Sequence, residues 1–393
     1  MSCYVSSNNN RFYVALESTF GTVPAITGQN RIPGVKLVAR QVPEAISRRD
    51  KTGSRTFPGL PNTIRKNTSY LLSTFMTEWT NQSVDPTMGP LFQAGMGAAP
   101  VYFNGGTVSA ATGTSGLASG ITFAAPHGLV AGQAVTHGSE IRFVSAIQDT
   151  TTVFFGAPFT NVNVGDALGK TATYRLASDI GSTSIFDYWD PSTAVQRILE
   201  GAVVDTMRLK VNGDFQEFAF GGPARDLLDS TSFATGQGGL TTFPVEPTST
   251  NFDYTVVPGH LGQVWMGATP TQFFTLTGAE LTLNNDAQLR VREFGSDLAR
   301  CVAAGKRNVK LNFSLFEQSD AQTRGLYQAA RQRSPIGVLI QLGQQSGQLF
   351  GAYMPAMVPE VPEFDDQETR LQWKFQNDRA QGTVNDELYV AFG

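Results

Sequence analysis

Residues 320–335 read DAQTRGLYQAARQRSP, and residues 85–100, which lie 235 positions earlier, read DPTMGPLFQAGMGAAP. Each segment starts with Asp, a favoured helix N-cap, and ends with Pro, which cannot continue a helix. Both segments are therefore predicted to form short helices, and their similarity indicates an internal repeat. The identical aligned pairs are Asp85/Asp320, Leu91/Leu326, Gln93/Gln328, Ala94/Ala329 and Pro100/Pro335.

The similarity extends to both sides of these helices. RKNTSYLLSTF from Arg65 resembles KRNVKLNFSLF from Lys306, and EFAFGGPAR from Glu217 resembles QWKFQNDRA from Gln372. In the segment after Lys306, apolar and polar residues alternate, which is the pattern of a half-buried strand. Because the matches keep the same order along the chain, we expect a tandem duplication.

The distance between matching segments changes along the chain and predicts an insertion. It falls from 235 residues at the helices to 155 at Glu217 and Gln372, so the first copy should contain 80 residues that the second lacks. The Gly/Ser/Thr-rich tract 104–184 fits this gap, and its short apolar runs indicate a small surface β domain. The expected domains are 1–103 with 185–245, the insert 104–184, and 246–393.

Turn signals set the expected fold class. Alternating apolar residues at 207–211 lead into Asn-Gly at 212–213, the strongest two-residue hairpin signal. A second alternating run at 371–375 follows the polar turn at 365–367, and GVLIQL from Gly337 is predicted to be a buried strand. We expect a mainly β protein with two tandem antiparallel sandwich or barrel domains, each with one flanking α-helix, plus the inserted β domain.

Composition excludes several classes of protein. Charged residues make up 16% of the 393 residues, against about 25% in an average soluble domain. No stretch reaches the roughly 20 apolar residues of a membrane helix, and the N-terminus lacks the pattern of a signal peptide. Cys3 and Cys301 cannot form a disulfide framework or a structural zinc site. A reducing cytoplasm is the expected compartment.

No residue pattern predicts catalysis, a metal site or a cofactor. The histidines His127 and His137 each precede Gly and are interpreted as turn residues. GDALGKT from Gly165 has too few residues between its glycines for a phosphate-binding loop. The acidic run 360–368 could serve glycoside hydrolysis or bind calcium, but a solvated turn is favoured. We expect that the chain is not an enzyme.

Basic residues cluster in two loops at matching places in the repeat. They fit either a contact with nucleic acid or an arm that reaches a neighbouring subunit. We favour the arm, because no aromatic residues stand between the basic ones at the spacing that base stacking needs. The candidates for this loop contact are Arg48, Arg49, Lys51, Arg55, Arg290, Arg292, Arg300 and Lys306.

Three further segments resemble the tail tube proteins (major tail proteins) of long-tailed bacteriophages. ALESTFGTVPA from Ala15 looks like the opening of these proteins, and TGAELTLNNDAQLRVREFGSD from Thr277 looks like their strand and loop. The final segment from Met354 is similar to their closing segment. The resemblance covers most of the chain outside the insert.

The resemblance implies a structural role in the virion. Members of this family assemble in the bacterial cytoplasm into stacked rings around a channel for double-stranded DNA. A ring of six tube domains would need three chains of this protein, a homotrimer with pseudo-six-fold symmetry. The implied partners are tail terminator and distal tail proteins at the ends, and tape measure protein and then DNA in the channel. The inter-ring loops would be 47–62 and 290–306.

A channel that does not bind DNA should not be basic. The net charge of −4 agrees with this, and we expect the polar residues of the inner strands to have a neutral or negative balance. The alternative is another virion β protein, such as a capsid decoration or tail-spike component. Tubes or rings in negative-stain images would distinguish the first function from the second. A carbohydrate-active enzyme and a soluble secreted adhesin are the remaining alternatives.

Overall fold

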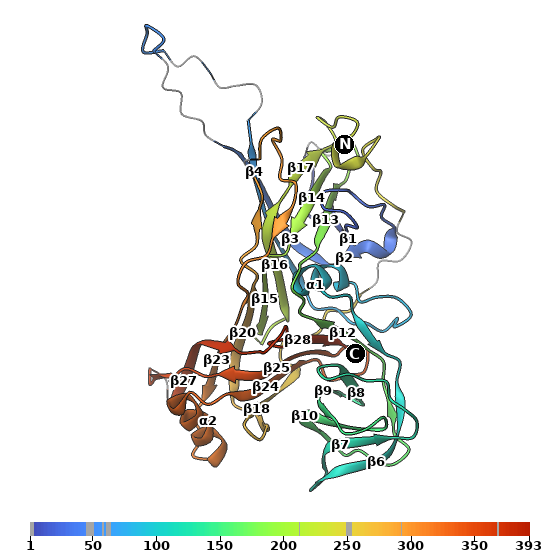
Figure 1. Cartoon of the computed structure of the whole chain (residues 1–393), viewed down its shortest axis with the longest axis vertical. Helices are drawn as coiled ribbons and strands as arrows, with labels where there is room; N and C mark the ends of the chain where they lie inside the picture. The colour runs from blue at the N-terminus through green and yellow to red at the C-terminus, as the bar shows by residue number, and fades with distance from the viewer. Residues whose placement is uncertain are drawn as a thin grey trace.

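The computed structural model describes residues 4–44, 51–56, 59, 64–211, 213–248, 254–291, 293–367 and 369–393. The prediction of a mainly β fold is confirmed, since strands make up 48% of the structure and helices 7%. Figure 1 shows an elongated molecule with long strands along one side and the separate sheet of residues 106–168 at the lower end. Neither helix of the described residues is long and apolar enough to cross a bilayer.

Eight strands form one continuous antiparallel sheet, which we call the long sheet, in the order β26-β27-β23-β20-β15-β16-β4-β3. Their alternation places one apolar and one polar residue set on opposite faces. The strands are β3 Gly34–Pro43, β4 Lys66–Phe75, β15 Thr206–Val211, β16 Glu217–Ala224, β20 Leu276–Asn284, β23 Asn308–Phe316, β26 Glu363–Asp365 and β27 Gln372–Ala380.

The long sheet turns a corner into a second layer. β25 pairs with β27 through Met357 and Val358, and the strands beyond it give a nearly closed, barrel-like sheet. The second-layer strands are β5 Val101–Phe103, β12 Thr171–Arg175, β18 Gly262–Gly267, β19 Thr271–Phe273, β24 Ile336–Leu342, β25 Phe350–Val358 and β28 Tyr389–Phe392.

A five-stranded sheet in the order β17-β14-β13-β1-β2 lies beside the N-terminal part of the long sheet (Figure 1). Its apolar residues, such as Phe12 and Leu199, join those of the long sheet in one core. Its strands are β1 Asn10–Leu16, β2 Arg31–Ile32, β13 Ser182–Trp189, β14 Arg197–Val203 and β17 Asp226–Asp229. Two short 3-10 helices, η1 Gly28–Asn30 and η2 Gln237–Gly239, lie in the connecting segments.

The two predicted helices are both present, but they begin differently. α2 spans Ala321–Gln332, and the Asp320 carboxylate accepts a 2.6 Å hydrogen bond from the backbone N–H of Thr323, as predicted for an N-cap. α1 spans Gly89–Met96 with Met88 at the N-cap, so the prediction of Asp85 as N-cap is wrong. The Asp85 carboxylate instead accepts a hydrogen bond from the Tyr102 hydroxyl.

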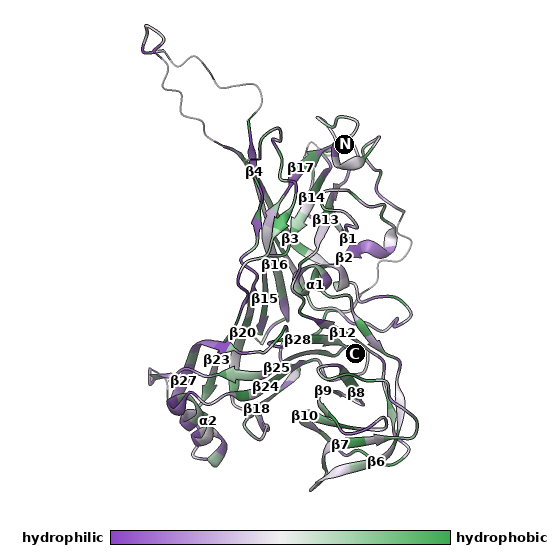
Figure 2. Cartoon of the chain, viewed as in Figure 1, coloured by the Kyte–Doolittle hydropathy of each residue, from purple (hydrophilic) through white to green (hydrophobic). Residues whose placement is uncertain are grey.

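The surroundings of the two helices explain their different polarity. Most of α1 is buried, and the ring of Phe92 lies within 5.9 Å (centroid to centroid) of five aromatic rings, from Tyr174, Phe218, Phe220, Phe350 and Phe392. α2 buries only Thr323, Leu326 and Ala330 and is largely hydrophilic in Figure 2. α1 is thus part of the core, whereas α2 covers the apolar face of the long sheet from outside.

Residues 106–168 form a separate six-stranded sheet in the order β11-β6-β7-β10-β9-β8. It has its own small core around Ile121, Val153 and Phe159. The strand expected in this region at 172–177 is present as β12, but it pairs with β5 and β28 outside this sheet. The six strands are β6 Gly106–Thr114, β7 Leu117–Phe123, β8 Ala134–His137, β9 Glu140–Ile147, β10 Thr152–Thr160 and β11 Ala167–Leu168.

The six-stranded sheet is fixed to the second layer by a buried interface. Phe143 stacks on Tyr353 with ring centroids 5.4 Å apart. The fully buried Arg142 donates to the side chains of Gln341 at 2.8 Å and Gln263 at 3.0 Å, and it forms an ion pair with Glu140 at 2.7 Å. One side of this sheet is therefore packed against the body of the protein, a contact that the sequence did not predict.

Candidate subunit interface

The long sheet consists of two halves with the same strand order. The strands of the first half are β3, β4, β15 and β16 along the chain, and they lie side by side in the order β3-β4-β16-β15. The strands of the second half are β20, β23, β26 and β27 along the chain, and they lie side by side in the order β20-β23-β27-β26. In both halves the fourth strand therefore lies between the second and the third. The two halves meet where β15 pairs with β20, so the third strand of one half joins the first strand of the next.

A β-bulge occurs at matching positions in the two halves. The pairing of β3 with β4 shifts between Gly34 and Lys36, and the pairing of β20 with β23 shifts between Leu276 and Gly278, 242 residues later. A bulge adds one residue to one strand and increases its local twist. The two halves therefore share a local irregularity as well as a strand order.

The two outermost strands of the long sheet are unpaired on one side within the described chain. β3 pairs only with β4, and β26 pairs only with β27. By position, β3 is the first strand of its half and β26 the third strand of its half. These two edges are the same two kinds of strand that meet at β15 and β20 inside the chain.

The edges carry side chains that can contact a neighbour. Phe364 on β26 stacks on Trp373 with ring centroids 5.3 Å apart, yet 56% of its surface is exposed. On β3, Val38 is 45% exposed, and Arg40 is exposed and forms no ion pair with a described residue. Exposed edge strands usually carry features that prevent pairing with other chains. An exposed aromatic residue on an open edge instead favours such pairing.

The polar face of the long sheet is basic, whereas the sequence-based expectation for strands that line a channel is a neutral or negative balance. Cross-strand partners share a face, so the registers of the strand pairs assign the charged residues of this face. Seven basic residues stand against four carboxylates, a net charge of +3, whereas the whole chain has −4. They are Lys36, Arg40, Arg208, Lys210, Lys310, Lys374 and Arg379, with Glu217, Glu280, Glu363 and Asp365.

The predicted loop residues are only partly described. Arg48, Arg49 and Arg292 lie outside the described residues. Lys51 and Arg55 are exposed in the segment 51–56, which lies beyond β3 and β4 and away from the rest of the described chain in Figure 1. Contact of these residues with an adjacent ring stays a prediction.

The second predicted loop, between β20 and β23, is held on the first half of the same chain. At its base, the buried Asn285 side chain donates to the carbonyls of Gly95 at 2.9 Å and Val204 at 3.0 Å. Farther along, Arg225 donates to the Ala299 carbonyl at 3.1 Å. This loop contains the short strands β21 Gln288–Leu289 and β22 Val302–Ala303. Among the predicted contact residues of this loop, Arg290, Arg300 and Lys306 are exposed.

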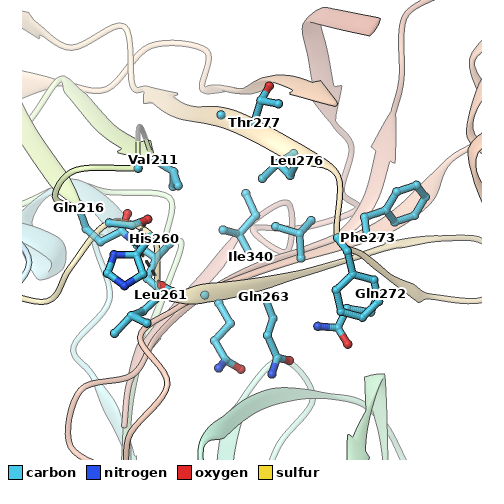
Figure 3. A pocket seen from close by; sticks show the side chains of 18 residues that line it. Val211, Gln216, His260, Leu261, Gln263, Gln272, Phe273, Leu276, Thr277 and Ile340 are labelled. Atoms are coloured by element: carbon cyan, nitrogen blue, oxygen red, sulfur yellow. Dashed lines mark hydrogen bonds between the residues drawn. The ribbon is translucent and has the colours of Figure 1, made fainter. Parts of the chain in front are cut away.

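A pocket of about 360 Å³ lies at the end of β15 and β20 opposite to this loop (Figure 3). Its walls are formed by Val211, Leu276 and Ile340, with the side chains of His260 and Gln216 on one side. Among the described residues that line it, none is acidic and His260 is the one histidine. In the described part of the chain, no group of three metal-ligating side chains occurs.

The other two histidines have local structural partners. The His137 ring lies 3.0 Å from the Asp166 carboxylate, and the His127 ring accepts from the backbone N–H of Leu129 at 2.8 Å. Lys170, in the glycine-flanked segment 165–171, donates to the Gln82 carbonyl at 2.5 Å. These three side chains therefore make structural contacts within the chain.

Two buried carboxyl groups have strongly altered acidity. Burial raises the pKa of Glu200 to about 7, although Arg225 lies 2.8 Å away and acts in the opposite direction. Burial also raises the pKa of Asp378 to about 7, and the carboxyl accepts a hydrogen bond from the Glu360 N–H at 2.7 Å. Glu200 lies on β14 and Asp378 on β27, which belong to different sheets.

The sequence matches no protein-family model, and it matches no curated protein sequence. The features of the molecule that bear on function are therefore the sheet edges, the polar face and the repeated strand order. The matching strand order was open to sequence reasoning through the repeat. The charge of the polar face was not, because it depends on which strands are neighbours.

Proposed function

We propose that this protein is a structural subunit of a phage tail tube, which assembles into stacked rings around a channel for double-stranded DNA. The observation that carries the proposal is the match between the junction inside the chain and its two open edges. A third strand and a first strand join at β15 and β20, and a third strand and a first strand are left open at β26 and β3. Repeating one junction between chains makes a heterologous contact that can close a ring.

The repeated features support a tandem arrangement of two tube domains. These features are the strand order, the bulge at matching positions, and one helix packed on each half. We accordingly propose the domains 1–103 with 185–245, 104–184, and 246–393. Three chains would then supply the six domains of a pseudo-six-fold ring, with the polar face of the long sheet toward the channel.

The internal junction also predicts the register between chains. At β15 and β20, Leu209 pairs with Leu281 and Arg208 with Thr282. Leu209 and Phe364 occupy equivalent positions in the two halves, because Leu209 pairs with Phe218 and Phe364 pairs with the matching residue Trp373. Leu281 and Ala39 are also equivalent, because each lies at the same distance along its strand from the β-bulge. The neighbour's Ala39 should therefore lie opposite Phe364.

This register brings opposite charges together. One residue along, Glu363 would stand opposite Arg40 of the next chain, and both are exposed. Directly opposed opposite charges contribute roughly 0.2–1 kcal/mol per pair, whereas like charges destabilise. Phe364 would lose its exposed surface against the same strand. The proposed contact would thus pair the Glu363 carboxylate with an opposite charge and bury the exposed ring of Phe364.

The proposed role is structural and involves no catalysis or cofactor. It places the protein in the phage tail, with tail terminator and distal tail proteins at the tube ends. Tape measure protein and later DNA would occupy the channel. The resemblance to tail tube proteins supports these partners, and the β-rich fold with open edges is compatible with them.

Electron microscopy of the purified chain at high concentration tests the proposal. We expect rings or tubes with three-fold symmetry, and Glu363→Arg should prevent their formation. The double variant Glu363→Arg/Arg40→Glu should restore it, and Arg324→Glu, an exposed position on α2, serves as the control. Isolated lobed particles without a channel would instead favour a capsid decoration or tail-spike component.

A further inference from the structure

The registers of the long sheet place four basic side chains in one row across the polar face. Lys36 pairs with Ser73, Ser73 with Ala219, and Ala219 with Arg208. On the other side of the row, Arg208 pairs with Thr282, Thr282 with Lys310, and Lys310 with Arg379. We call Lys36, Arg208, Lys310 and Arg379 the cationic row. No carboxylate stands in this row of seven residues.

All four side chains belong to the polar face. The neighbours of these residues along their strands are apolar or buried, such as Leu209 beside Arg208, Leu311 beside Lys310 and Ala380 beside Arg379. Lys36, Arg208 and Arg379 are exposed, and Lys310 is partly exposed. Since side chains alternate between the two faces of a strand, the cationic row points away from the core.

The row is only partly neutralised. Arg208 forms an ion pair with Glu280 at 3.2 Å, in which the Arg208 side chain is 53% exposed. Lys310 donates to the Asn377 side chain at 3.2 Å, which leaves its charge unchanged. Lys36 and Arg379 form no ion pair with the described chain. The remaining carboxylates of the face, Glu217, Glu363 and Asp365, occur in other rows.

The spacing of the row suits an extended polyanion. Neighbouring strands lie about 4.8 Å apart, so the row crosses seven strands over roughly 29 Å. Duplex DNA carries one negative charge per about 1.7 Å of its axis, and its affinity for a protein depends on how many phosphates are neutralised. Four cations in a line without an intervening acid can contact several phosphates of one duplex.

We propose that the cationic row is a phosphate-contact site for double-stranded DNA on the polar face of the long sheet. The identity of the polyanion as DNA rests on the proposed function; the site itself rests on the registers. In a ring, the rows of the chains would form a basic belt around the channel. Because the side chains contact only phosphates, binding is weak, independent of base sequence and sensitive to salt.

The salt dependence of binding measures the number of contacts. For the full-length chain, separated from assemblies by gel filtration, we expect a blunt DNA duplex of about 20 base pairs to bind at low salt. Four neutralised phosphates predict a slope of log K against log salt of about −3.6. The ion pair of Arg208 with Glu280 should make the slope less steep, at about −3.

Matched variants distinguish the row from general surface charge. Lys310→Ala/Arg379→Ala removes two contacts, so the slope should fall to about −1 and the affinity at 50 mM salt should drop by about a hundredfold. Arg324→Ala/Arg331→Ala removes the same charge from exposed positions on α2, on the other side of the sheet, and should leave binding unchanged. Circular dichroism checks that both variants are folded.

The outcomes separate this proposal from the proposed function. Equal loss of binding in the two double variants, or no binding of the wild-type chain at 20 mM salt, would overturn the cationic row even if rings form. Selective loss in Lys310→Ala/Arg379→Ala supports the row even if electron microscopy shows no rings. A slope that stays at about −3 in that variant would also rule the row out, because the counted contacts would then lie elsewhere.

Discussion

The ring centroids of Tyr327 in α2 and Trp373 in β27 lie 5.6 Å apart. In the other half of the long sheet, Phe92 in α1 and Phe218 in β16 lie 5.5 Å apart. These are the residues that the sequence repeat aligns, at offsets of 235 and 155 residues. Each helix is therefore anchored on its half of the sheet by the same aromatic contact.

The two contacts should differ in their contribution to stability. Phe92 is fully buried among five rings, so Phe92→Ala should lower the free energy of unfolding by about 3–5 kcal/mol. Tyr327 is only partly buried beside the exposed Phe364, so Tyr327→Ala should cost about 1–2 kcal/mol. Urea denaturation followed by tryptophan fluorescence measures both, and a larger loss for Tyr327→Ala would contradict this assignment of the core.

Local patterns were sufficient to predict several elements. The alternation of Val309, Leu311, Phe313 and Leu315 gives β23 with these four residues buried. The N-cap of α2 follows from Asp320, whose carboxylate accepts the predicted type of bond. Such features depend on residues close in sequence, which is why the sequence carries them.

Features that depend on distant partners were not predicted. The pattern of 172–177 indicates a strand, but it does not show that β12 pairs with the C-terminal β28. The sequence did not predict the basic charge of the polar face, for the same reason. Lys36, Arg208, Lys310 and Arg379 come from four segments of the chain and form a row only through the registers of six strand pairs.

Arg142 should determine how firmly the six-stranded sheet is attached. Arg142→Ala leaves Glu140 buried without its charged partner and removes the bonds to Gln263 and Gln341, which should cost about 3–5 kcal/mol. Hydrogen exchange should show the loss first in β8 and β9. The double variant Arg142→Met/Glu140→Gln, which leaves no unpaired buried charge, should recover part of it; equal exchange in both variants would refute the role of the ion pair.

Asp378 should make the protein less stable at alkaline pH than at pH 5.5. Its pKa is near 7 in the folded chain and near 3.8 when unfolded, so the folded state holds its proton over a range where the unfolded state has lost it. The stabilisation is complete below about pH 4 and is lost as the pH rises through about 7. Asp378→Asn should therefore raise stability at pH 8 by on the order of 2 kcal/mol and flatten the pH profile.

The control for this pH effect is Asp366→Asn, at an exposed position in the turn before β27. Its pH profile should match that of the wild-type chain between pH 5.5 and 8. Glu200→Gln should act like Asp378→Asn, since burial raises the Glu200 pKa to about 7 as well, but the loss of the charged bond to Arg225 offsets part of the gain. An unchanged profile for Asp378→Asn would show that another group controls the pH dependence.

Cysteine cross-linking should capture the proposed junction between chains in its predicted register. In a background with Cys3 and Cys301 replaced by Ser, Glu363→Cys/Arg40→Cys should form a disulfide between neighbouring chains under mild oxidation, because directly opposed strand residues have Cβ atoms about 4.5–5.5 Å apart. Within one chain, β26 and β3 lie at opposite edges of an eight-stranded sheet, so an intrachain bond is excluded by distance. A closed ring therefore predicts covalent trimers as the limiting product on non-reducing gels.

Glu363→Cys/Val42→Cys, two residues out of register, should give little product. Ladders longer than trimers would indicate that the same junction builds an open filament, and equal yields in both variants would show that the edges do not pair in the register of β15 and β20.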